Sequence, residues 1–122
     1  MHSPDAAPPD WPRPPRALPF CLLDRPPNGA RVTVAGLVLV RQRPGTAKGV
    51  IFVTLEDETG YLNLIVWQNV AERERSALLG AKLLGVRGRV QKEGEVLHVV
   101  AEKLHDYSGL LGDIVTQARN FH

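Results

Sequence analysis

Residues 31–104 contain runs rich in Val and Leu, and in two of these runs apolar and polar positions alternate with a period of two, the pattern of strands that bury one face and expose the other. This pattern predicts five strands, over residues 31–41, 50–56, 61–67, 82–91 and 96–104. Residues 69–80 instead place apolar side chains at helical spacing, with Asn69 as a candidate N-cap and Gly80 as the stop. We therefore expect a short helix between the third and fourth strands.

Glycines and prolines mark the bends and turns of this pattern. Gly36, in the middle of the first strand, predicts a bend or bulge where a sheet curls into a barrel. Residues 42–49 contain Pro44-Gly45 and form a loop, whereas residues 57–60 and 92–95 form tight hairpin turns. Three strands, a helix and two more strands follow the order of an all-β, five-stranded OB-fold Greek-key barrel. A small SH3-like barrel is the competing architecture, but it requires no helix at that place.

Alternation in the second and third strands separates a core face from an outward face. The residues expected in the core are Ile51, Val53, Leu55, Leu62, Leu64 and Val66. The residues expected to point outward are Phe52, Thr54, Glu56, Tyr61, Asn63 and Ile65. An aromatic ring, Phe52, is thus placed on the outside of the barrel.

The ends of the chain differ from its middle in composition. Nine of the ten prolines lie in residues 1–31, and proline removes backbone donors and favours extended conformations. We therefore predict a flexible Pro-rich tail or linker at residues 1–30, an OB-fold domain at residues 31–107 and a C-terminal extension at residues 108–122. Within the tail, residues 17–23 are apolar enough to dock on a neighbouring surface.

Charge and cysteine content narrow the possible functions. The net charge is only +2, from 15 Lys and Arg against 13 Asp and Glu, so binding to a polyanion requires local clustering. Cys21 is the single cysteine and the four histidines lack metal-ligand spacing, which predicts no disulfide, no metal and no cofactor. No run approaches the roughly 20 apolar residues of a membrane span. We expect a soluble, cytoplasmic protein without a membrane partner.

The loop after the first strand carries the clearest candidate binding residues. Arg41, Arg43 and Lys48 fall within eight residues that contain no acid, directly before Phe52. Such cations neutralise phosphates, and an exposed ring stacks on a base for about 1–3 kcal/mol. The competing interpretation is a solvated turn whose charges keep a sheet edge soluble, beside a Phe52 that another segment covers.

Three further candidates share the outward face with Phe52. Tyr61 offers a second stacking ring or packs at the rim, since it directly follows a turn. Asn63 either hydrogen-bonds a base or sugar or faces water, and Thr54 belongs to the same candidate surface.

The fourth strand supplies the last candidates. Arg87 and Arg89 lie on one side of it, and Lys92 follows in the next turn, so these cations can extend a positive track. The alternative is cross-hairpin pairing with acids. The acids within reach are Glu93, Glu95 and Glu102.

Catalytic patterns are missing from the sequence. The acidic run Glu56-Asp57-Glu58 alternates faces in a strand that enters a turn, so its carboxylates cannot easily converge on one ion. The chain also contains no Gly-rich phosphate loop followed by Lys-Ser/Thr, no nucleophile elbow and no Cys/His pair. We predict that the module is not an enzyme.

A family resemblance adds to these inferences. The segment VAGLVLVRQRPGTAKGVIFVTLEDETGYLNLIVW, continued by LLGVRGRVQKEGEVLHVVAEKL, closely resembles the C-terminal OB domain of the error-prone C-family bacterial DNA polymerase, the alpha-subunit paralogue of damage-induced mutagenic synthesis. FVTLEDETG is also similar to the anticodon-binding OB domains of class II tRNA synthetases, whose aromatic at the position of Phe52 stacks on a base.

The resemblance implies a DNA-replication and repair module that contacts single-stranded DNA beside an error-prone polymerase. Two alternatives remain open. One is a protein-interaction module that docks on a polymerase or mutasome partner, and the other is an anticodon-type RNA-binding domain.

Overall fold

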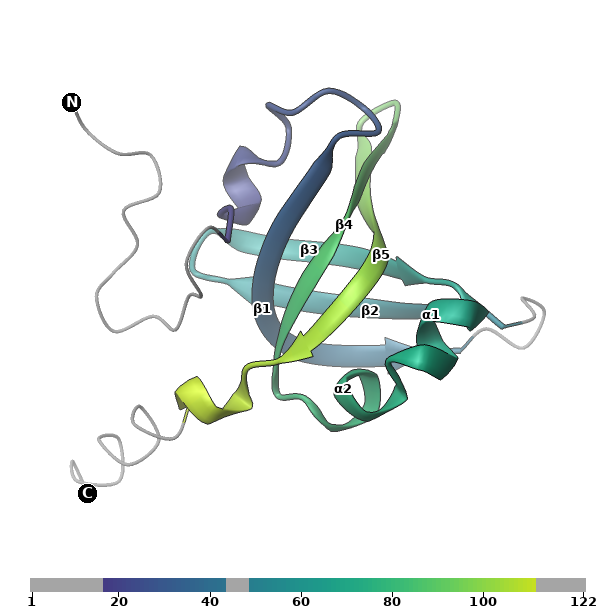
Figure 1. The fold of residues 1–122 in the computed structure, drawn as a ribbon. Coiled ribbons are helices and arrows are strands. Elements are labelled where there is room, and N and C mark those ends of the chain that lie inside the picture. Colours follow the sequence, from purple (N-terminus) through teal and green to yellow (C-terminus); the bar gives the residue numbers. More distant parts are fainter. Residues whose placement is uncertain (1–16, 44–48, 112–122) are drawn as a thin grey trace, which may run out of the picture.

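Five strands close into a barrel in the order β1-β2-β3-β5-β4 (Figure 1). The computed structural model of the chain describes residues 17–43 and 49–111. The strands are β1 (Arg31–Gln42), β2 (Ile51–Asp57), β3 (Gly60–Val66), β4 (Leu83–Glu93) and β5 (Val96–Asp106). The β3–β5 pair is parallel and the other four are antiparallel. The predicted five-stranded OB-fold barrel is confirmed.

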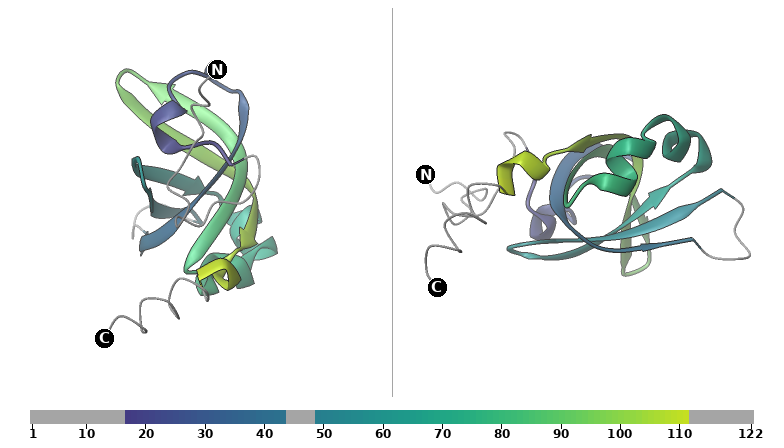
Figure 2. Two further views of the ribbon diagram at one scale, coloured as in Figure 1. Left: turned by 90° about the vertical axis from the view of Figure 1, so that its left-hand side faces the viewer. Right: turned by 90° about the horizontal axis from the view of Figure 1, so that it is seen from below.

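Two short helices, α1 (Gln68–Arg73) and α2 (Arg75–Gly80), connect β3 to β4 and lie together at one end of the barrel (Figures 1 and 2). The sequence predicts a single helix over residues 69–80. The structure breaks it at Glu74, whose φ of −108° and ψ of 28° leave the helical region. Single 3₁₀ turns, η1 (Phe20–Leu22) and η2 (Ser108–Leu110), flank the barrel.

The helix begins earlier than the sequence suggests. Trp67, not Asn69, occupies the N-cap position, and no side chain caps the helix there. Trp67 still has an extended backbone, with φ of −74° and ψ of 160°, so β3 runs directly into the helix. Val70 and Leu78 are buried in the core, where the two helices close the barrel end.

The core consists of the residues that alternation places inside. All six predicted core residues of β2 and β3 are at most 6% exposed. Gly36 faces the same interior, where a Cβ would lie 2.8 Å from the Glu56 carbonyl oxygen and 2.8 Å from the Phe20 ring. Gly36 is therefore required by close packing, and the irregularity expected at this glycine occurs slightly later in the strand.

That irregularity is a β-bulge at Leu39. Val38 pairs with Leu55 while Val40 pairs with Thr54, so Leu39 is an extra residue in β1. A one-residue insertion reverses which face every later side chain occupies. Val40 consequently points outward and is 43% exposed, whereas Arg41 pairs with Val53 on the inner side.

Residues 17–30 belong to the folded unit, so the predicted boundary at residue 31 is too late. Phe20 and Leu23 are buried in the core cluster, and the Leu18 amide donates to the Thr33 carbonyl at 2.7 Å. The apolar residues 17–23 thus cover the barrel itself, which removes the basis for docking a partner through them. Cys21 is exposed in this segment, and residues 1–16 lie outside the described residues.

Candidate nucleic-acid interface

The outward side chains of β2 and β3 form one continuous surface. Register pairs Phe52 with Ile65, Thr54 with Asn63 and Glu56 with Tyr61, and directly paired residues point to the same side of a sheet. The Thr54 hydroxyl donates to Asn63 Oδ1 at 3.0 Å. The Tyr61 side chain is 68% exposed. The structure therefore brings four predicted site residues together: Phe52, Thr54, Tyr61 and Asn63.

Neighbouring strands widen this surface with residues that the sequence did not single out. On one side Gln42 of β1 pairs with Phe52. On the other side His98 of β5 lies beside Asn63 and Val100 beside Ile65. The parallel pairing of β3 with β5 joins residues about 35 positions apart, and no local pattern reveals such a pairing.

Trp67 is a further outward aromatic that the sequence reasoning missed. It continues the alternation of Tyr61, Asn63 and Ile65 by one step, and 52% of the residue is exposed. The predicted third strand already included Trp67, so continuing its outward alternation one step past Ile65 would have identified it. β3 therefore presents an exposed ring near each of its ends.

Arg41 has a structural role: its side chain bonds to the end of α2 and does not lie free beside the loop. Its guanidinium donates from Nε to the Leu78 carbonyl at 2.6 Å and from a terminal nitrogen to the Ala81 carbonyl at 2.5 Å. These carbonyls lie at the C-terminal end of α2, where backbone acceptors have no partner within the helix and a positive charge is favourable. The bulge at Leu39 turns Arg41 inward to this position.

Arg43 lies at the edge of the surface, next to the loop. It is exposed and lines a hollow of about 290 Å³ between the end of β1 and the two helices. Arg75 contributes a second cation to this hollow, while Ile51 and Leu78 form part of its apolar lining. Lys48 lies outside the described residues, so its contact with phosphate stays a prediction.

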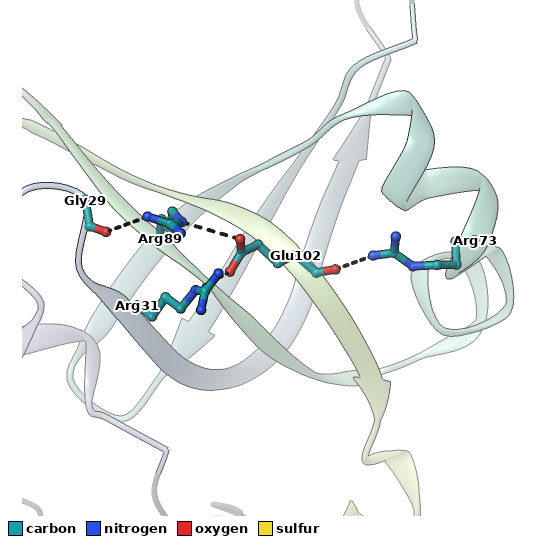
Figure 3. A network of polar contacts seen from close by, with 5 residues as sticks. All are labelled: Gly29, Arg31, Arg73, Arg89 and Glu102. Atoms are coloured by element: carbon teal, nitrogen blue, oxygen red, sulfur yellow. Dashed lines mark hydrogen bonds and ion pairs between the residues drawn. The ribbon is translucent and has the colours of Figure 1, made fainter.

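The three candidate cations of β4 have different surroundings. Lys92 donates from Nζ to the carbonyls of Asp24 and Pro26, both at 2.7 Å, and so anchors the N-terminal segment. Arg89 pairs with Glu102 at 3.4 Å (Figure 3), which is the cross-hairpin alternative noted above. Arg87 is exposed, and its side chain forms no hydrogen bond or ion pair with any residue of 17–43 and 49–111. These cations lie on the β4 side, beyond β5, and do not flank Phe52.

Catalytic or metal-binding groups do not stand out in the described ranges. No cluster of three His, Cys, Asp or Glu side chains with metal-binding geometry occurs among residues 17–43 and 49–111. Asp57, in the acidic run, is 3% exposed and accepts hydrogen bonds from the amides of Phe20, Thr59 and Gly60 at 2.8–3.0 Å. It therefore organises the turn and the N-terminal segment. In the same part of the chain no helix is long and apolar enough to cross a membrane.

Known proteins match this chain at the level of both sequence and fold. The error-prone DNA polymerase of Azoarcus sp. (strain BH72) is 55% identical over 107 residues, which cover 88% of this chain and 10% of the polymerase. That of Xanthomonas oryzae pv. oryzae (strain PXO99A) is 57% identical over 96 residues, covering 79% of this chain and 9% of the polymerase. The chain thus spans about a tenth of the length of these relatives.

Solved structures extend the match. Asparaginyl-tRNA synthetase from Pyrococcus horikoshii has a TM-score of 0.55 and 28% identity, covering 66% of this chain and 20% of the synthetase. A chain of the S. pombe Stn1-ten1 complex has a TM-score of 0.53 at 12% identity, covering 75% of this chain and 78% of its own length, and so shares the fold alone. The resemblance to error-prone polymerases is confirmed. The family model that matches residues 32–107 is the OB-fold nucleic acid binding domain, and the chain belongs to this family.

Proposed function

We propose that this chain is a non-catalytic module that binds single-stranded DNA in error-prone DNA synthesis. The observation that carries the proposal is the surface centred on Phe52, in which a ring on β2 lies between the exposed rings of Tyr61, on β3, and Trp67, directly after β3, and next to a hydrogen-bonding pair. OB-folds bind single strands on this face of the barrel, between the β1–β2 and β4–β5 loops.

Stacking supplies the sequence-independent part of the binding. A base that lies on Phe52 gains about 1–3 kcal/mol, and Tyr61 and Trp67 offer rings for bases on either side. Asn63 keeps its amide N–H groups for a base edge, because the Thr54 hydroxyl uses the oxygen.

Electrostatics favour one edge of the surface for the phosphates. Glu56 pairs with Tyr61 at the end nearest the β2–β3 turn, and a carboxylate there repels a phosphate backbone. Arg43 and Arg75 lie at the opposite end. The backbone therefore runs near the β1–β2 loop while the bases face the strands.

The relatives favour DNA over RNA. Error-prone DNA polymerases are 55–57% identical to this chain, whereas the asparaginyl-tRNA synthetase is 28% identical. We propose that the module holds a single strand for a polymerase whose chemistry takes place elsewhere, and that such a polymerase is its partner.

Fluorescence anisotropy with labelled single-stranded DNA over a salt series tests this function. We expect salt-dependent binding, and about tenfold weaker binding for Phe52→Leu, which keeps apolar bulk but removes the ring. Leu110→Ala is the control, since Leu110 is an exposed apolar residue outside the barrel strands. Unchanged affinity in Phe52→Leu contradicts the proposal, and stronger competition by RNA than by DNA of one sequence supports the anticodon-type alternative.

A further inference from the structure

A second cationic surface surrounds Glu102 on the β1, β4 and β5 side of the barrel (Figure 3). Arg31 and Arg89 pair with its carboxylate, at 3.3 and 3.4 Å, and Arg73 donates to its carbonyl at 2.5 Å. Arg87 and Lys103 line a hollow with Arg31 and Glu102. We call these five cations and Glu102 the Glu102 patch. The Glu102 carboxylate thus pairs with two of the five cations, and Arg73 also pairs with Glu74 at 3.6 Å.

The strand register places these cations against one another. Arg31 is directly opposite Arg89, and Arg87 is directly opposite Lys103. Like charges in directly opposed positions destabilise a sheet. Glu102 relieves the repulsion in the first pair, but no ion pair within the described residues relieves it in the second. The barrel therefore places four cations in two directly opposed pairs, and Glu102 offsets the repulsion in only one of them.

The ion pairs of the patch leave it open to another anion. The Arg31 and Arg89 side chains are 65% and 51% exposed, and the Glu102 side chain 39%. Exposed pairs contribute only about 0–1 kcal/mol. Guanidinium groups bind phosphate through paired hydrogen bonds, so a phosphodiester can share or replace the carboxylate. The hollow between Arg31, Arg87, Glu102 and Lys103 has a volume of about 280 Å³.

One row of side chains connects the patch to Phe52. Phe52 pairs with Ile65, Ile65 with Val100, Val100 with Arg89 and Arg89 with Arg31. Neighbouring strands are about 4.8 Å apart, so Arg89 lies about 14 Å across the barrel surface from Phe52. The row crosses the strands, as a nucleic acid on an OB-fold does.

Trp67 borders this row. It lines a second hollow of about 280 Å³ together with Arg73, Ala101 and Glu102. Because Glu102 belongs to both hollows, they adjoin. An exposed ring thus lies where the aromatic surface meets the Glu102 patch, which favours a single strand with unstacked bases over a duplex.

We propose that the Glu102 patch binds the phosphates of the same single strand after it leaves the Phe52 surface. This inference rests on the proposed function, and it adds a direction: the strand crosses from the β1–β2 loop over β3 and β5 to β4. Arg87 and Lys103 contact phosphates that a short oligonucleotide held on Phe52 does not reach.

A length series tests this path. Oligothymidylates of about 3, 6, 9, 12 and 15 nucleotides span the known site sizes of OB-folds. The full chain is compared with Arg87→Gln/Lys103→Gln, which removes a like-charge pair and so preserves the fold. Lys82→Glu is the control, because it changes the net charge equally at an exposed site before β4.

We expect the double variant to bind the shortest strand as the wild type does and to lose affinity progressively with length. For the longest strand, two lost phosphate contacts lower the salt slope by about 1.4 and the affinity about 25-fold at 0.1 M salt. Phe52→Leu, in contrast, weakens binding at every length.

Three results overturn the inference. The double variant binds every length as tightly as the wild type does, or it loses affinity by the same factor at every length. The third result is a loss in Lys82→Glu equal to that in the double variant. A loss seen only with duplex DNA overturns it too and assigns the patch to a duplex. If the wild type binds no single strand, the proposed function itself fails. If Phe52→Leu weakens binding but the double variant does not, only the path over the Glu102 patch fails.

Discussion

Asp57 holds the N-terminal segment on the barrel, and its substitution should destabilise the protein strongly. One carboxylate oxygen accepts the Phe20 amide at 2.8 Å. The other accepts the Thr59 amide and hydroxyl, at 2.8 and 2.6 Å, and the Gly60 amide at 3.0 Å. A hydrogen bond to a charged group contributes about 1.5–3 kcal/mol, and an orphaned buried donor costs about 1–3 kcal/mol.

Because these hydrogen bonds are not additive, we expect Asp57→Ala to lower the free energy of unfolding by about 3–5 kcal/mol. That is a large share of the roughly 5–15 kcal/mol of a typical domain. Asp57→Asn retains one acceptor oxygen for the turn but loses the acceptor of Phe20 N–H, so we expect about 1–3 kcal/mol. For a domain of this size each kcal/mol lowers Tm by about 4–8 °C.

Urea denaturation followed by circular dichroism measures the change in stability. Asp24→Asn, at an exposed position of the same segment, is the matched control and should stay within about 0.5 kcal/mol. Limited chymotrypsin digestion reports on the segment itself, since Phe20 is buried and its amide is held by Asp57. Cleavage after Phe20 should be faster in Asp57→Asn than in the wild type. The reasoning would be refuted if Asp57→Asn had the same urea denaturation midpoint and the same digestion rate as the wild type.

Other positions give further tests. Arg41→Gln should cost about 2 kcal/mol of stability, because two α2 carbonyls lose their donor; unchanged stability with about tenfold weaker DNA binding would instead make Arg41 a phosphate contact. Gly36→Ala should cost about 1–3 kcal/mol in thermal unfolding, since its Cβ would lie 2.8 Å from a carbonyl oxygen, and wild-type Tm would contradict this. Hydrogen bonds from the Ser108 side chain and then its backbone lower the pKa of Asp106. The resulting stability is present at neutral pH and is lost as pH falls through that pKa. In Ser108→Ala the pKa should rise towards its ordinary value in a carboxyl NMR titration, and no change would refute the assignment.

Alternation predicted the barrel because each strand packs one face against the core. The period-two pattern of β2 and β3 identified six buried residues and the outward position of Phe52. The bulge at Leu39 was not predictable in this way, since a single extra residue leaves both alternations of a Val- and Leu-rich strand apolar. Its consequence, the inward turn of Arg41, was missed with it.

The N-terminal segment was misjudged for a related reason. Its prolines predicted a flexible tail, yet Phe20 and Leu23 complete the core. The contact that fixes the segment joins Phe20 to Asp57, 37 residues away. Only the folded barrel brings these two residues together, so local composition could not reveal the contact.

Cations that look alike in the sequence also fall into two groups in the folded protein. Arg41 and Lys92 donate to backbone carbonyls and hold one segment against another. Arg87 and Lys103 face each other across β4 and β5, and no ion pair within residues 17–43 and 49–111 offsets their repulsion. Selection for stability alone accounts for the first arrangement but not for the second, because exposed like charges in register weaken a sheet. In the complex proposed above, a polyanion that crosses the barrel would turn this repulsion into binding energy, and the net charge of +2 would then matter less than the face on which these charges lie.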